Sequence, residues 1–332
     1  MLKKTPWAVL RMNPWPIRLI GIVLFAVLLI RVDIGELGSA ISSANPLWVL
    51  LSFGLILPLI WLKTLRWQGI LHAQSVKVRI WPAYWAYLGG LFAGVVTPGR
   101  IGEFTRAFQV AQAYGIPKSR AFASVLADRL FDLYVLIVVG TIAMLAVAAE
   151  FGVVLIIVVT LFIALFPVAI LVDNRIFRVL NRTSKVGNVR ISAVLSRWVS
   201  WASEVREDLR KLTGPKFAVA LLITLASYAL FFTQAYLLAL AVDLPIGFGY
   251  VVLVMALSSL VALIPVSISG LGTRDLVVVA YLATLGITSE LALGFSLLVF
   301  LTFYVGSGLI GAAAWFLKPL PMERSCPKGD KK

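Results

Sequence analysis

Charged residues cluster inside a hydrophobic part of the chain, between positions 97 and 132. Thr97-Pro98-Gly99 interrupts one apolar run, and the next apolar run carries acidic and basic residues well inside it. A charge in the hydrocarbon region of a membrane costs at least about 2.5–3.5 kcal/mol unless a partner or water stabilises it. The pattern therefore predicts a binding site. Its charged residues are Arg100, Glu103, Arg106, Asp128, Arg129 and Asp132.

The residue types favour an anion such as phosphate. Arginine binds phosphate through paired hydrogen bonds. Where a helix is interrupted, the ends of the helices expose backbone amide groups and a positive dipole that also suit an anion. The carboxylates could balance the arginines, or bind a cationic headgroup or a proton. For any single residue the alternative is a purely structural ion-pair network. Asp128 and Asp132 are four residues apart, so they share one face of a helix.

A second basic pair lies earlier in the chain. Lys63 and Arg66 are one helical turn apart and lie beside Trp61 and Trp67. Snorkelling toward an aromatic belt explains Lys63, whereas Arg66 lies deeper and is a candidate for the site.

Enzyme chemistry has little support in the residue inventory. His72 is the single histidine and Cys326 the single cysteine of the chain, so a histidine-based catalytic or metal cluster and an intrachain disulfide are excluded. A phosphate-binding P-loop is missing from the sequence, so ATP is not the direct energy source. We predict no catalytic residues, no metal and no cofactor.

The composition predicts an all-α polytopic membrane protein. Hydrophobic residues make up 61% of the 332 residues and charged residues 14%, and apolar runs of about 20 residues recur. The net charge of +15 comes from basic residues at the ends of apolar segments and in one loop. This distribution indicates membrane topology and contact with anionic lipids rather than nucleic acid.

About eight hydrophobic segments form one membrane domain, residues 1–318, followed by a basic cytoplasmic tail, 319–332. The first, 19–30, fits an uncleaved helix better than a signal peptide. Residues 173–216 hold ten Lys/Arg against four Asp/Glu, which indicates a cytoplasmic loop. An amphipathic helix at 189–212 is expected to lie on anionic lipid or on the cytoplasmic face of the protein itself. The other predicted spans are 46–70, 120–148, 151–172, 217–242 and 291–317.

Two segments, 80–113 and 248–285, are interrupted at corresponding positions of an internal repeat. The repeat halves are 46–148 and 216–317. The matching pairs are Pro98 with Pro265, 167 residues apart, and Gly102 with Gly270 and Arg106 with Arg274, each 168 apart. Basic residues flank the first interruption and acidic residues the second. The positive-inside rule therefore predicts six full spans and two re-entrant hairpins in an inverted repeat.

The second interruption supplies further candidates. Predicted hinge residues are Pro98, Gly99, Gly102, Pro265, Gly270 and Gly272, and predicted substrate-binding residues here are Ser267, Ser269, Arg274 and Asp275. We expect six charges to converge around one cavity near the middle of the membrane. These are Arg100, Glu103, Arg106, Asp128, Arg274 and Asp275.

At these residues the chain resembles the lysylphosphatidylglycerol synthase transmembrane-region family, also described as flippase-like integral membrane proteins. The resemblance covers nearly the whole chain. Asp275 departs from it, since a glutamate is expected there. The matching pieces are Leu65-Arg66-Trp67, Thr97 through Glu103 with Arg106, Asp128-Arg129 with Asp132, and Pro265 through Ser267, with Ser269, Gly270, Gly272, Arg274 and Asp275.

The resemblance implies a stand-alone membrane module that moves lipid between leaflets. We expect no aminoacyltransferase domain, because the last apolar segment ends about 15 residues before Lys332. The expected substrate is a phospholipid or a polyprenyl-phosphate lipid, in a cell membrane, with both termini cytoplasmic. The alternatives are a non-transporting scaffold for a partner glycosyl- or aminoacyltransferase, and a lipid-headgroup enzyme with Glu103 or Asp128 as general base.

Overall fold

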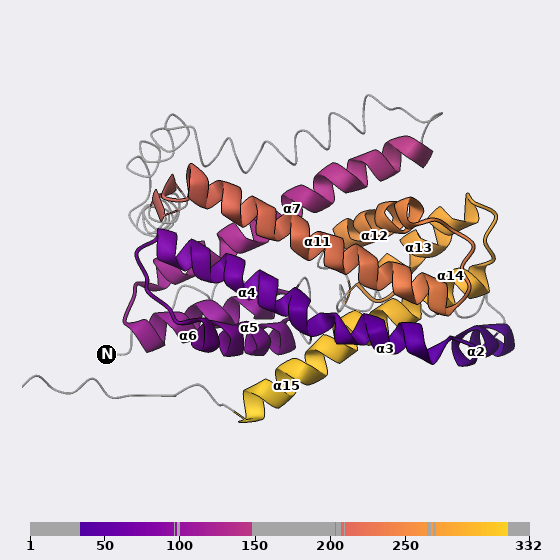
Figure 1. The fold of residues 1–332 in the computed structure, drawn as a ribbon, viewed down its shortest axis with the longest axis horizontal. Helices are drawn as coiled ribbons and strands as arrows, with labels where there is room; N and C mark the ends of the chain where they lie inside the picture. Colours follow the sequence, from indigo (N-terminus) through magenta and orange to yellow (C-terminus); the bar gives the residue numbers. More distant parts are fainter. Residues whose placement is uncertain are drawn as a thin grey trace, which may run out of the picture.

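The computed structural model describes residues 34–95, 97, 100–147, 203, 207–208, 210–263, 267 and 270–317, and all regular secondary structure in this part is helical. Figure 1 shows the arrangement of the helices. Several predicted features lie outside the described residues. They are the spans at 19–30 and 151–172, most of the amphipathic helix at 189–212, the tail at 319–332, and Pro98, Gly99, Pro265 and Ser269.

The first half of the fold combines long helices with a pair of shorter helices that are separated by the first interruption. Asn45 caps the first long rod, its side chain accepting a hydrogen bond from the Leu47 amide, and Pro46 occupies the first turn. The rod, α3 and α4, is bent at Leu55. The elements are α2 (Ile34–Ser42), α3 (Pro46–Gly54), α4 (Ile56–Ala73), α5 (Ile80–Val95), the short 3₁₀ helix η2 (Ile101–Phe104), α6 (Thr105–Tyr114) and α7 (Lys118–Val147).

The second half follows the same order: a long helix, then two shorter helices separated by the second interruption, then a long rod. Its last rod contains a π-helical segment, a wider coil that is common at functional sites. The elements are α11 (Pro215–Ala241), α12 (Phe248–Ala262), α13 (Thr273–Ala283), α14 (Ser289–Val299), the π helix η3 (Phe300–Gly306) and α15 (Ser307–Leu317).

Three rods of the described part are long and apolar enough to cross a membrane: Pro46–Ala73, Pro215–Ala241 and Ser289–Leu317. They lie where the sequence predicts the spans 46–70, 217–242 and 291–317. Helix α7 is as long, with 30 residues, but carries the charged residues. Large apolar side chains on the outer faces, such as Leu50, Leu222 and Phe316, are exposed, as expected for helices that contact lipid.

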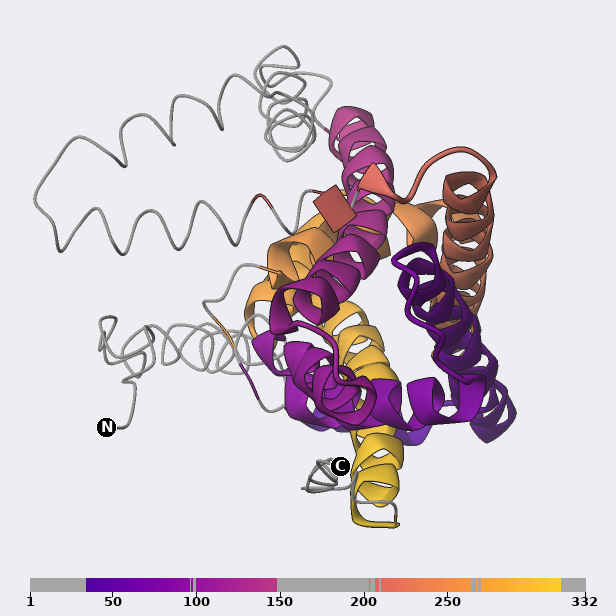
Figure 2. The ribbon, with the colours of Figure 1, turned by 90° about the vertical axis from the view of Figure 1, so that its left-hand side faces the viewer.

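The two halves pack against each other reciprocally. Helix α5 of the first half packs on α15 of the second, and α12 of the second half packs on α7 of the first. The rods α3–α4 and α11 also pack together, and they run side by side in Figures 1 and 2. Helices α5 and α6 lie toward one end of the long axis, whereas α12, α13 and α14 lie toward the other (Figure 1).

The segment before α11 contacts the beginning of α7. Asp208 lies 3.5 Å from Arg120 Nε and 2.6 Å from Lys211 Nζ. Leu212 packs against the buried cluster of Ile70, Ala127, Phe131 and Ala220. Two positions were expected for the amphipathic helix, on anionic lipid or on the protein itself. At the carboxyl-terminal end of this segment, the contact with α7 fits docking on the protein itself.

Candidate functional site

Eight charged side chains form one continuous chain of ion pairs between α4, the η2–α6 segment and α7. Three carboxylates alternate with the cations, and each carboxylate contacts at least two of them. All predicted first-half site residues belong to this network. The cations are Lys63, Arg66, Arg100, Arg106 and Arg129, and the carboxylates are Glu103, Asp128 and Asp132.

Asp128 is the most deeply buried carboxylate of the network. Its Oδ1 lies 2.7 Å from Arg66 Nε, and its Oδ2 lies 2.6 Å from Arg106 Nη2. All three side chains are buried. Burying isolated charges is strongly unfavourable, so two arginines on one carboxylate tie α4, α6 and α7 together at this point.

Asp132, one turn further along α7, contacts three cations. Arg66 Nη1 lies 2.9 Å from its Oδ1, while Lys63 Nζ and Arg129 Nη1 lie 3.1 and 3.8 Å from its Oδ2. Arg66 Nη1 also donates to Thr224 Oγ1 of α11 at 3.0 Å. The prediction that Lys63 only snorkels is therefore wrong, because its ammonium group turns inward to Asp132.

Glu103 links the hinge segment to α7. Its Oε1 lies 2.8 Å from Arg100 Nε, and its Oε2 accepts a hydrogen bond from Arg129 Nη2. Arg100 has a φ of 57°, a left-handed conformation that is uncommon outside glycine. The backbone at the end of the first hinge thus adopts an unusual conformation at the residue that contacts Glu103.

Two aromatic side chains that were not predicted as site residues, Tyr87 and Trp67, complete the site. The guanidinium carbon of Arg106 lies 4.2 Å from the centroid of the Tyr87 ring and 4.7 Å from that of Trp67. Trp67 Nε1 donates to Ser124 Oγ at 3.0 Å. Trp67 was interpreted as part of an interfacial belt, yet it is fully buried. Its position next to Arg66 in the sequence was the available signal.

The second hinge forms its own buried cluster. Arg274 Nη2 lies 2.5 Å from Asp275 Oδ1 and donates to the Ser296 carbonyl at 3.1 Å. Asp275 also accepts hydrogen bonds from Ser296 Oγ and the Gly272 amide, at 2.5 and 2.8 Å. The Asp275 carboxylate thus accepts the hydrogen bond of the Gly272 backbone amide, next to the start of α13. The sequence predicted that such amides at a helix break bind an anionic ligand. Ser267 Oγ lies 2.8 Å from Thr273 Oγ1.

Two of the predicted hinge glycines allow close backbone approach. A Cβ on Gly102 would lie 2.0 Å from the Ala93 carbonyl oxygen, and a Cβ on Gly270 would lie 2.7 Å from Ala262 Cβ. Gly270 and Gly272 also have positive φ angles, 81° and 83°. In both halves, the segment after the hinge returns directly against the end of the preceding helix.

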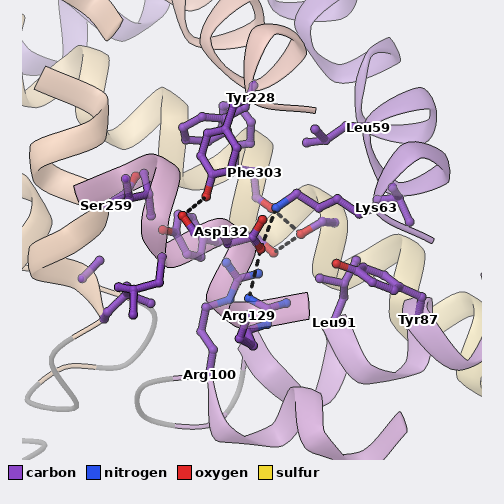
Figure 3. Close-up of a pocket in the computed structure, with 18 of the residues that line it drawn as sticks. Leu59, Lys63, Tyr87, Leu91, Arg100, Arg129, Asp132, Tyr228, Ser259 and Phe303 are labelled. Carbon is purple, nitrogen blue, oxygen red and sulfur yellow. Dashed lines mark hydrogen bonds and ion pairs between the residues drawn. The ribbon is translucent and has the colours of Figure 1, made fainter. Parts of the chain in front are cut away.

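A cavity of about 290 Å³ lies between the two halves, bordered by α4, α5, α7, α11, α12 and η3. Its charged side chains, Lys63, Arg100, Arg129 and Asp132, point toward one another in Figure 3. The rest of the lining is mainly apolar and aromatic. It includes Leu59, Leu91, Leu126, Leu130, Phe231 and Phe303.

The expectation that six charges converge on one cavity is wrong in part. Of the six, only Arg100 lines it, since Glu103, Arg106 and Asp128 lie behind the lining charges. Arg274 and Asp275 do not line it, because Asp275 and Ser296 hold the Arg274 guanidinium behind Tyr304. Tyr304 lines the cavity, and its ring centroid lies 5.2 Å from the Arg274 guanidinium carbon.

The sequence of the chain is similar to those of known membrane proteins. The sequence model of the family described as "Lysylphosphatidylglycerol synthase TM region" matches residues 18–311. Two UPF0104 membrane proteins of Methanothermobacter thermautotrophicus are each 24% identical, over 82% and 84% of this chain and 86% of their own lengths. A UPF0104 membrane protein of Methanocaldococcus jannaschii is 21% identical over 90% of this chain and 93% of its own length.

Proposed function

The chain belongs to the lysylphosphatidylglycerol synthase transmembrane-region family, and from this premise we propose that it is a lipid translocator. It moves a phospholipid or a polyprenyl-phosphate lipid between leaflets of the cell membrane. The observation that carries the proposal is the cavity of about 290 Å³, which combines a largely apolar lining with Lys63, Arg100 and Arg129. Such a lining suits a molecule that has both acyl chains and an anionic headgroup.

The proposal includes an inverted repeat with two re-entrant hairpins, α5–α6 and α12–α13. Three observations support it. The hairpins lie toward opposite ends of the molecule in Figure 1, and each packs on the last rod of the other half. Arg106 contacts Asp128 and Arg274 contacts the Ser296 carbonyl, in both cases 22 residues further on. Inverted repeats that meet at a central site are typical of alternating access.

The cavity lies where these halves meet. Its lining comes from α4, α5 and α7 of the first half and from α11, α12 and η3 of the second. Rocking one half against the other would expose the same headgroup site to each leaflet in turn. We further propose that both termini are cytoplasmic, because basic residues such as Lys118 and Arg120 flank the end that holds α6.

Filling the cavity tests the translocator directly. Leu130 lines the cavity from α7, whereas Val138, two turns further along the same helix, is exposed on its outer face. In proteoliposomes with fluorescent phospholipid, we expect the wild-type protein and Val138→Trp to flip lipid faster than protein-free liposomes do. Leu130→Trp should lose this activity. The proposal would be excluded if the wild-type protein flipped neither anionic phospholipids nor polyprenyl phosphates faster than protein-free liposomes do.

A further inference from the structure

The ion-pair network contains more positive than negative charge. Five cations, Lys63 and four arginines, contact three carboxylates, which leaves two positive charges in excess. The described salt bridges bring no fourth carboxylate into contact with these cations. The nearby pair of Arg274 and Asp275 is neutral by itself and does not change this balance.

Three of the five cations line the cavity: Lys63, Arg100 and Arg129. The side chains of Lys63, Arg129 and Arg100 are 19%, 22% and 28% exposed, whereas those of Arg66 and Arg106 are at most 1% exposed. The two inner arginines are thus enclosed with Asp128, whereas the three outer cations border the cavity and can contact a ligand there while they remain paired with Glu103 or Asp132.

We propose that the cavity selects a lipid with a doubly charged phosphomonoester headgroup; this inference rests on the proposed translocator function. A phosphomonoester carries about 1.5–2 negative charges near pH 7, which matches the excess of two. A phosphodiester supplies one negative charge, and a zwitterionic headgroup supplies none in net. Unbalanced charge is costly in a medium of low dielectric constant, so the dianion forms the most stable complex.

The lining indicates that the phosphate belongs to a lipid rather than to a small soluble molecule. Leu59, Leu126 and Leu130 border the same space as the three outer cations, and aromatic side chains close it on the side of the second half. Burial of acyl chain against this surface adds favourable free energy that a free phosphate ester cannot gain.

Two lipids that differ by one methyl group test the charge argument. Isothermal titration calorimetry on the purified full-length protein in detergent would measure the affinity for three ligands. They are short-chain phosphatidic acid, its methyl ester phosphatidylmethanol, and glycerol 3-phosphate. We expect phosphatidic acid to bind at least about tenfold tighter than phosphatidylmethanol, because a charge-assisted contact is lost. Glycerol 3-phosphate should bind more weakly than phosphatidic acid.

Matched variants assign the preference to the cavity. Arg129→Gln and Lys63→Gln each remove one outer cation and should reduce the preference for phosphatidic acid about tenfold. Lys118→Gln, at an exposed position, should retain it. A thermal melt of each variant separates loss of the preference from loss of folding.

The outcomes distinguish this inference from the proposed function. Equal affinity for phosphatidic acid and phosphatidylmethanol overturns the selectivity, while flipping in proteoliposomes would still support translocation. Tight, selective binding without flipping of any lipid supports the site and contradicts the translocator. If glycerol 3-phosphate binds as tightly as phosphatidic acid, the ligand is a soluble phosphate ester and the lipid assignment is wrong.

Discussion

Arg100 and Arg274, which come from the two hinge segments, contact the same aromatic ring. Their guanidinium carbons lie 5.5 and 5.2 Å from the centroid of Tyr304 in the π helix η3. Arg100 belongs to the ion-pair network and lines the cavity, whereas Arg274 is held by Asp275. We therefore expect that a change in the position of one hinge alters the surroundings of the other through the Tyr304 side chain.

Removing this ring should weaken the coupling between the hinges. Each cation–π contact contributes about 0.5–2 kcal/mol, so Tyr304→Leu should slow lipid flipping in proteoliposomes severalfold, while Tyr304→Phe should preserve most of the rate. Phe316→Leu, at an exposed position of α15, serves as the control. Equal rates for Tyr304→Leu and Tyr304→Phe would show that the ring has no coupling role.

Neutralising Asp128 should destabilise the protein strongly. Asp128→Asn leaves Arg66 and Arg106 buried without their shared carboxylate, and breaking a buried pair typically costs about 3–5 kcal/mol. We expect a markedly lower melting temperature in detergent by intrinsic fluorescence. Asp243→Asn, at an exposed turn, should melt like the wild type. An unchanged melting temperature for Asp128→Asn would mean that the network does not stabilise the fold.

Most members of the first-half ion-pair network were predictable from the sequence, because charges inside apolar helices stand out. Lys63 was missed, since its spacing from Trp61 and Trp67 fits a snorkelling residue equally well. Its role depends on Asp132, 69 residues away, and no local pattern reports such a contact. Tyr304 was missed for the same reason, since a tyrosine in an apolar rod gives no sign of two arginines packed on it.

The second hinge shows a different limit of sequence reasoning. The sequence placed Arg274 and Asp275 correctly as a charged pair at a helix break, yet it expected them to line the cavity. Their charges are instead paired with each other, and Ser296 of α14 contacts both side chains. Whether a buried charge faces a ligand or a neighbouring helix depends on packing, and the spacing of residues does not encode it.

The first hinge depends on a glycine. Gly102→Ala would place a Cβ 2.0 Å from the Ala93 carbonyl oxygen, which forces the hinge segment away from α5. We expect a lower melting temperature and slower flipping. Gly69→Ala in α4 is the matched control, since a Cβ there meets nothing within 4 Å and a helical alanine stabilises by roughly 0.5–1 kcal/mol. Wild-type behaviour of Gly102→Ala would contradict the close approach.

The proposed inverted orientation of the hairpins predicts opposite accessibility of their connecting turns. In a Cys326→Ser background, Lys118→Cys marks the start of α7, directly after the turn that follows α6, and Asp243→Cys marks the turn before α12, both at exposed positions. A membrane-impermeant maleimide applied to intact cells should label only Asp243→Cys, and permeabilised cells should label both. Labelling of both turns from one side in intact cells would rule out the inverted arrangement.

The position of the carboxylate in the second half offers a test of the repeat itself. Arg106 pairs with Asp128, and the residue 168 positions after Asp128 is Ser296, whose carbonyl contacts Arg274. The carboxylate of the second half is carried by Asp275 instead, and Ser296 Oγ lies 2.5 Å from its Oδ1. The two halves therefore place a carboxylate beside the equivalent arginine from different helices.

Moving this carboxylate should rescue its loss. Asp275→Ala leaves Arg274 buried without a counter-charge and should lower the melting temperature, since removal of one partner of a buried pair costs about 3–5 kcal/mol. Adding Ser296→Asp supplies a carboxylate from the position equivalent to Asp128, so the double variant should recover much of the stability. If Ser296→Asp lowers the melting temperature further in the Asp275→Ala background, the two arginine sites are not equivalent, and the repeat does not extend to the contacts of its buried charges.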